Sequence, residues 1–95
     1  MMSKTFFTRE KPAEVMKEAA SIVPESFADV EEIVKRLELK EGVVVDFDGI
    51  APESAQRMLD FVCGAVFAMR GSIKKIKKRA YILIPDGVKI TTVRD

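Results

Sequence analysis

The stretch from Val43 to Met69, VVVDFDGIAPESAQRMLDFVCGAVFAM, decides the fold because it reads as a strand, a turn and a helix in succession. The consecutive valines that open it predict a mostly buried strand ending near Phe47. Asp48 and Gly49 predict a tight turn. Pro52 fits the first turn of a helix, and the apolar spacing carries that helix to the end of the stretch.

This helix has more apolar surface than one face needs. Its expected core stripe, at helical spacing, consists of Ala55, Met58, Leu59, Val62, Val66 and Met69. From Phe61 onward, Gly64, Ala65 and Ala68 add a second apolar face. A helix that is apolar nearly all round is buried on more than one side. Little of a 95-residue chain remains to cover that face, so we expect a partner helix to pack there. The small side chains would let the backbones of the two helices approach closely.

A second helix is predicted upstream, from Ser26 to a left-handed glycine cap at Gly42. Ser26 and Asp29 have capping-box spacing, with Asp in place of the usual Glu or Gln. The apolar stripe of this helix consists of Phe27, Val30, Ile33, Val34 and Leu37. Its solvent-exposed face carries two i,i+4 pairs of opposite charge, Glu31–Lys35 and Glu32–Arg36. A short strand is expected before it, over residues 19–23, and Pro24 ends that strand.

Downstream of the quoted stretch the pattern predicts a hairpin with strands over residues 72–77 and 80–84. The spacing from Ile73 to Ile76 breaks strict alternation, which indicates a bulge or an early twist of the strand. Pro85, Asp86 and Gly87 predict a turn, and residues 88–92 a last short strand.

These elements predict one α+β domain. Two helices are expected to pack on one face of a mixed four- to five-stranded sheet, as a small β-α-β-α-β-β sandwich with room for one more strand. The core domain is assigned to residues 19–95. Residues 1–18 form a leader, either flexible or strand-like, or holding a short helix from Pro12.

The composition argues against catalysis. The chain has no histidine, which is the commonest general base and metal ligand. Its single cysteine, Cys63, excludes an internal disulfide framework and a cysteine-rich zinc site. The five glycines never approach a phosphate-loop pattern. We therefore expect no catalytic residue, no cofactor and no metal, and no apolar run is long enough to span a bilayer.

Three further features have a structural and a functional interpretation. Asp46 and Asp48 could form a carboxylate pair, but a strand end and an Asp-Gly turn explain them better. Cys63 is interpreted as packed or at an interface rather than as a reactive thiol. The run from Arg70 to Arg79 holds six cations. This run is either a solvent-exposed edge strand whose lysines prevent aggregation with other strands, or a binding surface. Such a surface would contact phosphate groups or an acidic peptide.

The run from Ala55 to Ala68 resembles the signature of the SepF cell-division family, an AxRxxDFxxG segment followed by small, apolar, aromatic and Ala positions. The resemblance continues through Arg70-Gly71-Ser72-Ile73, the hairpin and Ile84-Pro85-Asp86-Gly87-Val88. Upstream, Pro24-Glu25-Ser26-Phe27 is similar to the proline-led start of the first helix in that family. Residues 22–90 are covered, and the combined pattern is more specific than any one piece.

The resemblance implies a non-enzymatic adaptor that binds the C-terminal tail of the tubulin-like division protein FtsZ. Such proteins dimerise or polymerise and link the division ring to the cytoplasmic membrane through an N-terminal amphipathic helix. By position, Ala55, Lys75 and Tyr81 match residues linked to tail binding, and Gly64, with Ala65 and Ala68 beside it, matches a self-association site. A cytoplasmic protein recruited to the division site is implied.

Other motif residues are interpreted as structural, namely Arg57, Asp60 and Phe61. At their i,i+3 spacing, Arg57 and Asp60 can pair with each other. The chain departs from the family at its start, where no membrane helix is evident, so membrane contact is expected only if an N-terminal amphipathic segment exists. It departs again at the turn Lys77-Lys78-Arg79, where relatives often have glycine. The alternative function is a small nucleic-acid-binding module using the basic run, which the shortage of stacking aromatics disfavours.

Overall fold

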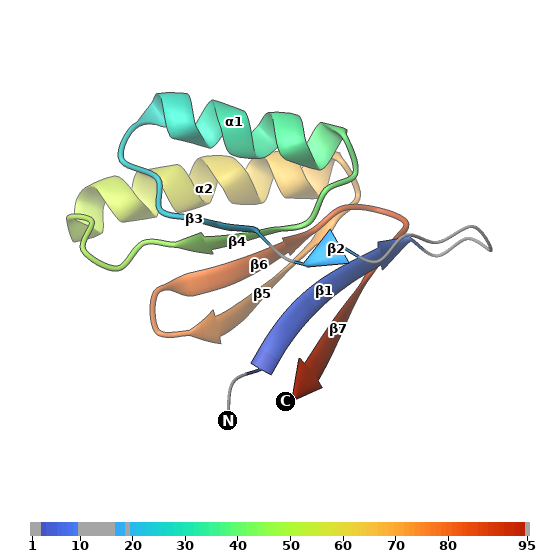
Figure 1. Cartoon of the computed structure of the whole chain (residues 1–95). Helices are drawn as coiled ribbons and strands as arrows, with labels where there is room; N and C mark the ends of the chain where they lie inside the picture. Colours follow the sequence, from blue (N-terminus) through green and yellow to red (C-terminus); the bar gives the residue numbers. More distant parts are fainter. Residues whose placement is uncertain (1–2, 10–16, 19, 95) are drawn as a thin grey trace.

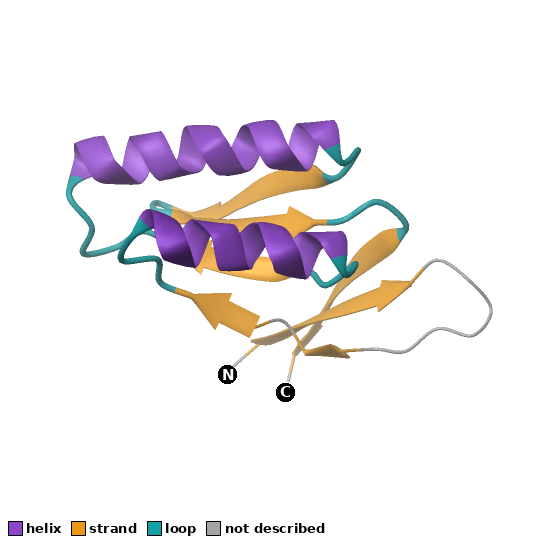
Figure 2. Cartoon of the chain, turned by 90° about the horizontal axis from the view of Figure 1, so that it is seen from above, coloured by secondary structure: helices purple, strands orange, loops and turns teal. Residues whose placement is uncertain are grey.

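The computed structural model describes residues 3–9, 17–18 and 20–94. Two helices, α1 (Phe27–Glu38) and α2 (Pro52–Ala68), lie side by side over one face of a four-stranded sheet (Figures 1 and 2). The strand order is β3-β4-β6-β5, with bounds Ala20–Ile22, Val43–Asp46, Ala80–Ile84 and Ser72–Lys77. β3 pairs with β4 in parallel and the other pairs are antiparallel. The predicted α+β class, with two helices on a mixed sheet, is confirmed.

A second sheet lies on the side of the molecule away from the helices (Figure 1). Its order is β2-β1-β7, with bounds Lys17–Glu18, Ser3–Arg9 and Val88–Arg94. β1 and β7 pair antiparallel along their whole length, from Ser3 opposite Arg94 to Arg9 opposite Val88. The last predicted strand is therefore longer than expected and pairs with the leader, not with the main sheet. The leader is strand-like over residues 3–9, and residues 12–16 of the suggested helix lie outside the described residues.

The main core lies between the helices and the sheet. It consists of buried side chains from both layers: Val30, Ile33, Leu37, Val43, Val45, Phe47, Ala55, Met58, Val62, Val66 and Leu83. Each large one adds about 1.5–3 kcal/mol of hydrophobic stabilisation. A smaller cluster of Ile82, Ile84 and Val88 lies on the other face of the sheet, with Val44 and Ile90 packed against it. The start of β7 thus covers part of the face that the helices leave open.

Both ends of α1 differ in detail from the prediction. Ser26 is the N-cap, but its hydroxyl makes no capping hydrogen bond; instead the Asp29 carboxylate accepts the backbone N–H of Glu25 at 2.9 Å. The left-handed cap at Gly42 is wrong, because Lys40 takes that conformation with φ 63°. The backbone N–H groups of residues 40 and 41 donate to the carbonyls of residues 37 and 36, at 3.0 and 2.9 Å, which closes the helix two residues earlier.

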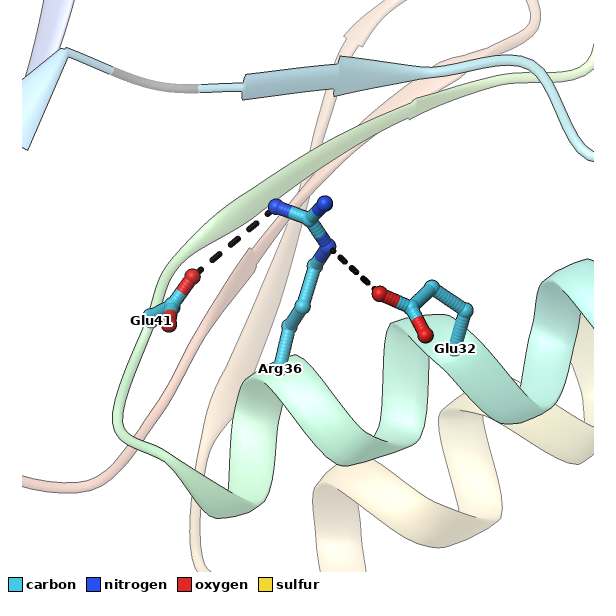
Figure 3. A network of polar contacts seen from close by, with 3 residues as sticks. All are labelled: Glu32, Arg36 and Glu41. Atoms are coloured by element: carbon cyan, nitrogen blue, oxygen red, sulfur yellow. Dashed lines mark ion pairs between the residues drawn. The ribbon is translucent and has the colours of Figure 1, made fainter.

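One of the two expected i,i+4 pairs forms on α1. The Arg36 Nε lies 3.4 Å from Oε1 of Glu32, and its Nη1 lies 3.8 Å from Oε1 of Glu41 (Figure 3). No ion pair joins Glu31 to Lys35 within the described residues. Both Arg36 contacts are partly exposed and long, so each adds at most about 1 kcal/mol. Together they connect the last turn of α1 to the segment that leads into β4.

At the end of α2 the chain passes very close to β6. Arg70 has a positive φ of 60°, and the Gly71 N–H donates to the Val66 carbonyl at 2.9 Å. A Cβ atom at Gly71 would lie 2.5 Å from the backbone oxygen of Ile84, much closer than a carbon and an oxygen can approach. Only glycine therefore fits here without moving a strand of the main sheet.

Replacing Gly71 with alanine is expected to lower the free energy of unfolding by about 1–2 kcal/mol, because the added methyl group forces α2 and β6 apart. Urea unfolding measures the change. Ser72→Ala is the matched control, since Ser72 is the exposed next residue and its truncation should change stability by less than about 0.5 kcal/mol. Equal stability of Gly71→Ala and the wild-type protein would contradict the close approach.

Candidate functional site

A groove of about 480 Å³ opens between the start of α2 and the hairpin of β5 and β6. We call it the hairpin groove. Its apolar lining comes from five residues: Phe47, Pro52, Ala55, Leu59 and Tyr81. Its polar lining is Gln56, Lys75, Lys78 and Arg79. The groove therefore has an apolar floor and a cationic side, and none of the residues that line it is acidic.

A β-bulge decides which hairpin side chains reach the groove. Lys75 lies opposite Tyr81, but the next pair is Lys77 opposite Ala80, so Ile76 is the extra residue. Cross-strand partners share a face of the sheet, which puts Lys75 beside Tyr81 on the helix-covered face. The predicted bulge is confirmed. It turns Lys77 to the opposite face, where its Nζ lies 3.5 Å from Oδ2 of Asp46.

The aromatic wall of the groove is held by the core. Phe47 is only 3% exposed, and Tyr81 packs on it edge-to-face with ring centroids 6.1 Å apart. Tyr81 is half-buried and contacts the main core. Its hydroxyl makes no hydrogen bond with any side chain or backbone group of the described residues, so this wall is a fixed ring with a free polar tip.

The hairpin turn is fastened to the segment that precedes α2. The Arg79 Nη2 donates a partly buried hydrogen bond of 2.7 Å to the carbonyl of Ile50. The Phe47 N–H donates to the Arg79 carbonyl at 2.8 Å. These bonds hold the two walls of the groove together from residues far apart in the sequence.

A second hollow of about 400 Å³ lies at the tip of the hairpin, next to the groove. We call it the charged cleft, because all its lining residues are ionisable: Asp46, Asp48, Lys77, Lys78 and Arg79. Asp46 ends β4 and accepts the backbone N–H of Asp48 at 2.8 Å. With its other oxygen facing Lys77, this carboxylate is occupied within the fold, which agrees with the turn interpretation of the two acids.

The outward face of α2 is apolar over its second half, as expected. Phe61 is 51% exposed and Phe67 is 86% exposed, and Gly64 and Ala68 are exposed between them, with Ala65 half-buried. We call these five residues the α2 outer face. Phe61 also contacts Phe27 of α1 edge-to-face, with ring centroids 6.1 Å apart. Apart from the adjacent backbone of α2, no atom in the described part of the chain lies within 4 Å of a Cβ built at Gly64. A glycine inside a helix costs about 1 kcal/mol relative to alanine, and no neighbour in the described chain requires it.

The pairing of Arg57 with Asp60 that their i,i+3 spacing allows does not form. Oδ1 of Asp60 instead accepts a hydrogen bond of 2.8 Å from Nε2 of Gln56, at i,i+4 spacing. Both side chains of the expected pair are exposed, so water competes with any weak attraction between them. Cys63 is half-buried on the same helix. Burial, and to a lesser extent the Asp60 carboxylate, raises the pKa of its thiol, which keeps the thiol protonated and unreactive.

The sequence of this chain matches a known protein family. The model of the family described as "Cell division protein SepF" matches residues 20–90. This chain belongs to the SepF family. The match begins at β3 and ends inside β7, so the helix-covered sheet, the hairpin groove and the α2 outer face all lie within the SepF region. β1 and β2 lie before it.

Curated SepF relatives are similar over most of the chain. "Cell division protein SepF 2" of Desulforamulus reducens is 37% identical over 84 residues, which is 88% of this chain and 52% of the relative. "Cell division protein SepF" of Acetivibrio thermocellus is 40% identical over 67 residues, 70% of this chain and 43% of the relative. The chain spans about half the length of these relatives. The solved "SepF-like protein from Pyrococcus furiosus" has the same fold, with a TM-score of 0.65 at 21% identity over 70% of this chain and 84% of that one.

Ala55, Lys75 and Tyr81, the three residues that the SepF resemblance linked to a partner, all line the hairpin groove. Sequence reasoning missed Pro52 and Leu59, which shape the groove, and it placed Lys78 and Arg79 in the basic run without assigning them to this site. The i,i+4 spacing from Ala55 to Leu59 and the position of the basic turn were the signals available for them. The two apolar faces of α2 are separate, and the groove uses neither Gly64 nor Ala68.

Three other kinds of site find little support in the described part of this SepF-family chain. The second aromatic ring near the basic run, Phe47, is buried, so the hairpin does not present a pair of stacking rings for bases. Among the described residues no group of three His, Cys, Asp or Glu side chains is placed to hold a metal ion. No helix in the described ranges has the length and apolar character needed to cross a membrane.

Proposed function

We propose that this SepF-family chain is a non-enzymatic division adaptor that binds the C-terminal tail of FtsZ in the hairpin groove. The observation that carries the proposal is the convergence of Ala55, Lys75 and Tyr81 on one groove. Ala55 comes from the first turns of α2, and the other two come from the hairpin. These are the residues that match tail-binding positions of the SepF family.

The lining of the groove suits a short peptide with mixed chemistry. Apolar side chains of the peptide pack against Ala55, Leu59 and the Tyr81 ring, where burial of apolar surface contributes about 25 cal/mol per Å². Lys75 lies on the same face of the sheet as that ring, and its ammonium group can form an ion pair with an acidic side chain of the peptide. A groove of about 480 Å³ holds only a few residues, so we expect modest affinity that a self-associating adaptor raises by avidity.

Self-association is assigned to the α2 outer face. It exposes large apolar rings at Phe61 and Phe67 around Gly64, whose missing side chain serves no contact within the described chain. A second copy of α2 packed there uses Gly64, Ala65 and Ala68 for close approach of the backbones. The groove stays open in such a dimer, because it is lined by the first turns of α2 whereas the α2 outer face lies over the second half of the helix.

In this role the chain acts in the cytoplasm, at the inner face of the membrane where the cell divides. Its own membrane contact requires an N-terminal amphipathic segment.

Isothermal titration calorimetry with synthetic FtsZ C-terminal tail peptides tests the proposal. We expect saturable binding of one peptide per groove, and none with a scrambled peptide of the same composition. Failure to bind FtsZ tails from every source tried would rule the adaptor function out.

The nucleic-acid alternative is tested in parallel with single-stranded RNA at low ionic strength. Affinity that falls steeply as salt rises, because phosphate contacts release counterions, would favour that function instead. We expect no such binding.

A further inference from the structure

The hairpin turn carries three consecutive cations, and the structure gives each of them different surroundings. Lys77 faces Asp46, with 3.5 Å between Nζ and Oδ2. Arg79 donates to the Ile50 carbonyl at 2.7 Å. Lys78 forms no ion pair or hydrogen bond with any other side chain in the described ranges. Two cations of the turn are therefore occupied by the fold, and the middle one is available.

The contacts of its neighbours fix where Lys78 stands. The Arg79 hydrogen bond is partly buried and joins the hairpin to the segment before α2. The Phe47 N–H adds a backbone bond to the Arg79 carbonyl at 2.8 Å. The Lys77 ion pair holds the other side of the turn to the end of β4. A turn braced on both sides presents its middle side chain from a set position, which reduces the entropy lost on binding.

Lys78 lies at the junction of the two hollows, since it lines both the hairpin groove and the charged cleft. The charged residues that line the groove are all cations, whereas Asp46 and Asp48 line the cleft. The end of the groove next to the turn therefore favours negative charge in whatever binds there. Lys78 is exposed and can reach such a group without breaking a contact of the fold.

We propose that Lys78 is a specificity-determining residue of the hairpin groove. It pairs with a carboxylate of the bound peptide, and so selects FtsZ tails that carry an acidic side chain at the end of the bound segment nearest the hairpin turn. This inference rests on the proposed function and adds to it the charge and the placement of one ligand group. It also gives a role to the turn at which the chain departs from the glycine of its relatives.

Charge reversal at Lys78 tests the inference against a matched control. Lys74→Glu makes the same change of charge on an exposed residue of β5, but Lys74 is not among the residues that line the groove. Tail-peptide titration should show binding weakened about tenfold by Lys78→Glu and by less than about twofold by Lys74→Glu. The neutral variant Lys78→Gln should fall between them. Circular dichroism checks that each variant is folded.

A charge swap in the peptide completes the test. Each acidic residue of the tail is replaced in turn by lysine, and each peptide is titrated against the wild-type protein and Lys78→Glu. One substituted peptide is expected to bind Lys78→Glu more tightly than it binds the wild type. That peptide identifies the acidic residue that Lys78 contacts.

The outcomes separate the two proposals. Wild-type binding with equal loss in Lys78→Glu and Lys74→Glu would show a general charge effect and overturn the role of Lys78. Unchanged affinity of Lys78→Glu, or no peptide that favours it, would do the same and leave the adaptor function standing. No binding of any tail to the wild-type protein would overturn both.

Discussion

Replacing Gly64 with lysine is expected to convert the self-associated protein to a monomer while leaving its fold intact. Apart from the adjacent backbone of α2 itself, no atom of the described residues lies within 4 Å of a Cβ at this position, so the monomer has room for the new side chain. A second α2 packed on the α2 outer face does not, and it would also have to bury an ammonium group against Phe61, at a cost of several kcal/mol. Light scattering coupled to size exclusion measures the mass.

Two companion variants sharpen this test. Ser72→Lys adds the same side chain at an exposed position of β5, and it should leave the mass unchanged. Gly64→Ala should raise helix stability by about 1 kcal/mol in the monomer, yet weaken the dimer if backbones meet at this residue. An unchanged mass for Gly64→Lys would place the interface between copies elsewhere.

Tyr81→Ala is expected to weaken binding of the FtsZ tail by about thirtyfold or more, which corresponds to about 2 kcal/mol. The Tyr81 ring forms the aromatic wall of the groove and is held in place by Phe47, whose centroid is 6.1 Å away. Its removal takes away apolar contact area and lets water into the floor. Titration calorimetry with the wild type and the variant measures the difference.

Tyr81→Phe separates the ring from its hydroxyl. The phenylalanine keeps the edge-to-face contact with Phe47, so we expect it to bind within a few-fold of the wild type. Because Tyr81 also contacts the main core, near-ultraviolet circular dichroism must first show that the alanine variant is folded. A folded Tyr81→Ala with wild-type affinity would remove Tyr81 from the binding site.

The helices and strands of this fold could be predicted because clear sequence signals mark where they begin and end. Pro52 starts α2 at its first position, and the hairpin strands have the expected bounds. The pairing of β1 with β7 could not be predicted in the same way. It joins residues from opposite ends of the chain, and apolar periodicity carries no information about which strands become neighbours. The cap at Gly42 was misplaced because Lys40 takes the left-handed conformation two residues earlier, although it is not a glycine.

The site shows the same division between local pattern and tertiary placement. Residue patterns indicated a second apolar face on α2 and a cationic hairpin, and the family resemblance indicated Ala55, Lys75 and Tyr81. That these three residues share one groove depends on the bulge at Ile76 and on how α2 crosses the sheet. The pairing of Arg57 with Asp60 that their spacing allows does not form, and Gln56 donates to Asp60 instead. Spacing alone does not decide between such competing partners.

The antiparallel pairing of β1 and β7 also has a mechanical consequence. Ser3 stands opposite Arg94, so the two ends of the described chain leave the molecule at the same point (Figures 1 and 2). A force that pulls these ends apart would break the hydrogen bonds between β1 and β7 one residue pair at a time. It would not load all of these bonds in shear at once. The β1–β7 pair would then open and lengthen under low tension. The helices α1 and α2, the main sheet and the groove that they form would stay unstretched.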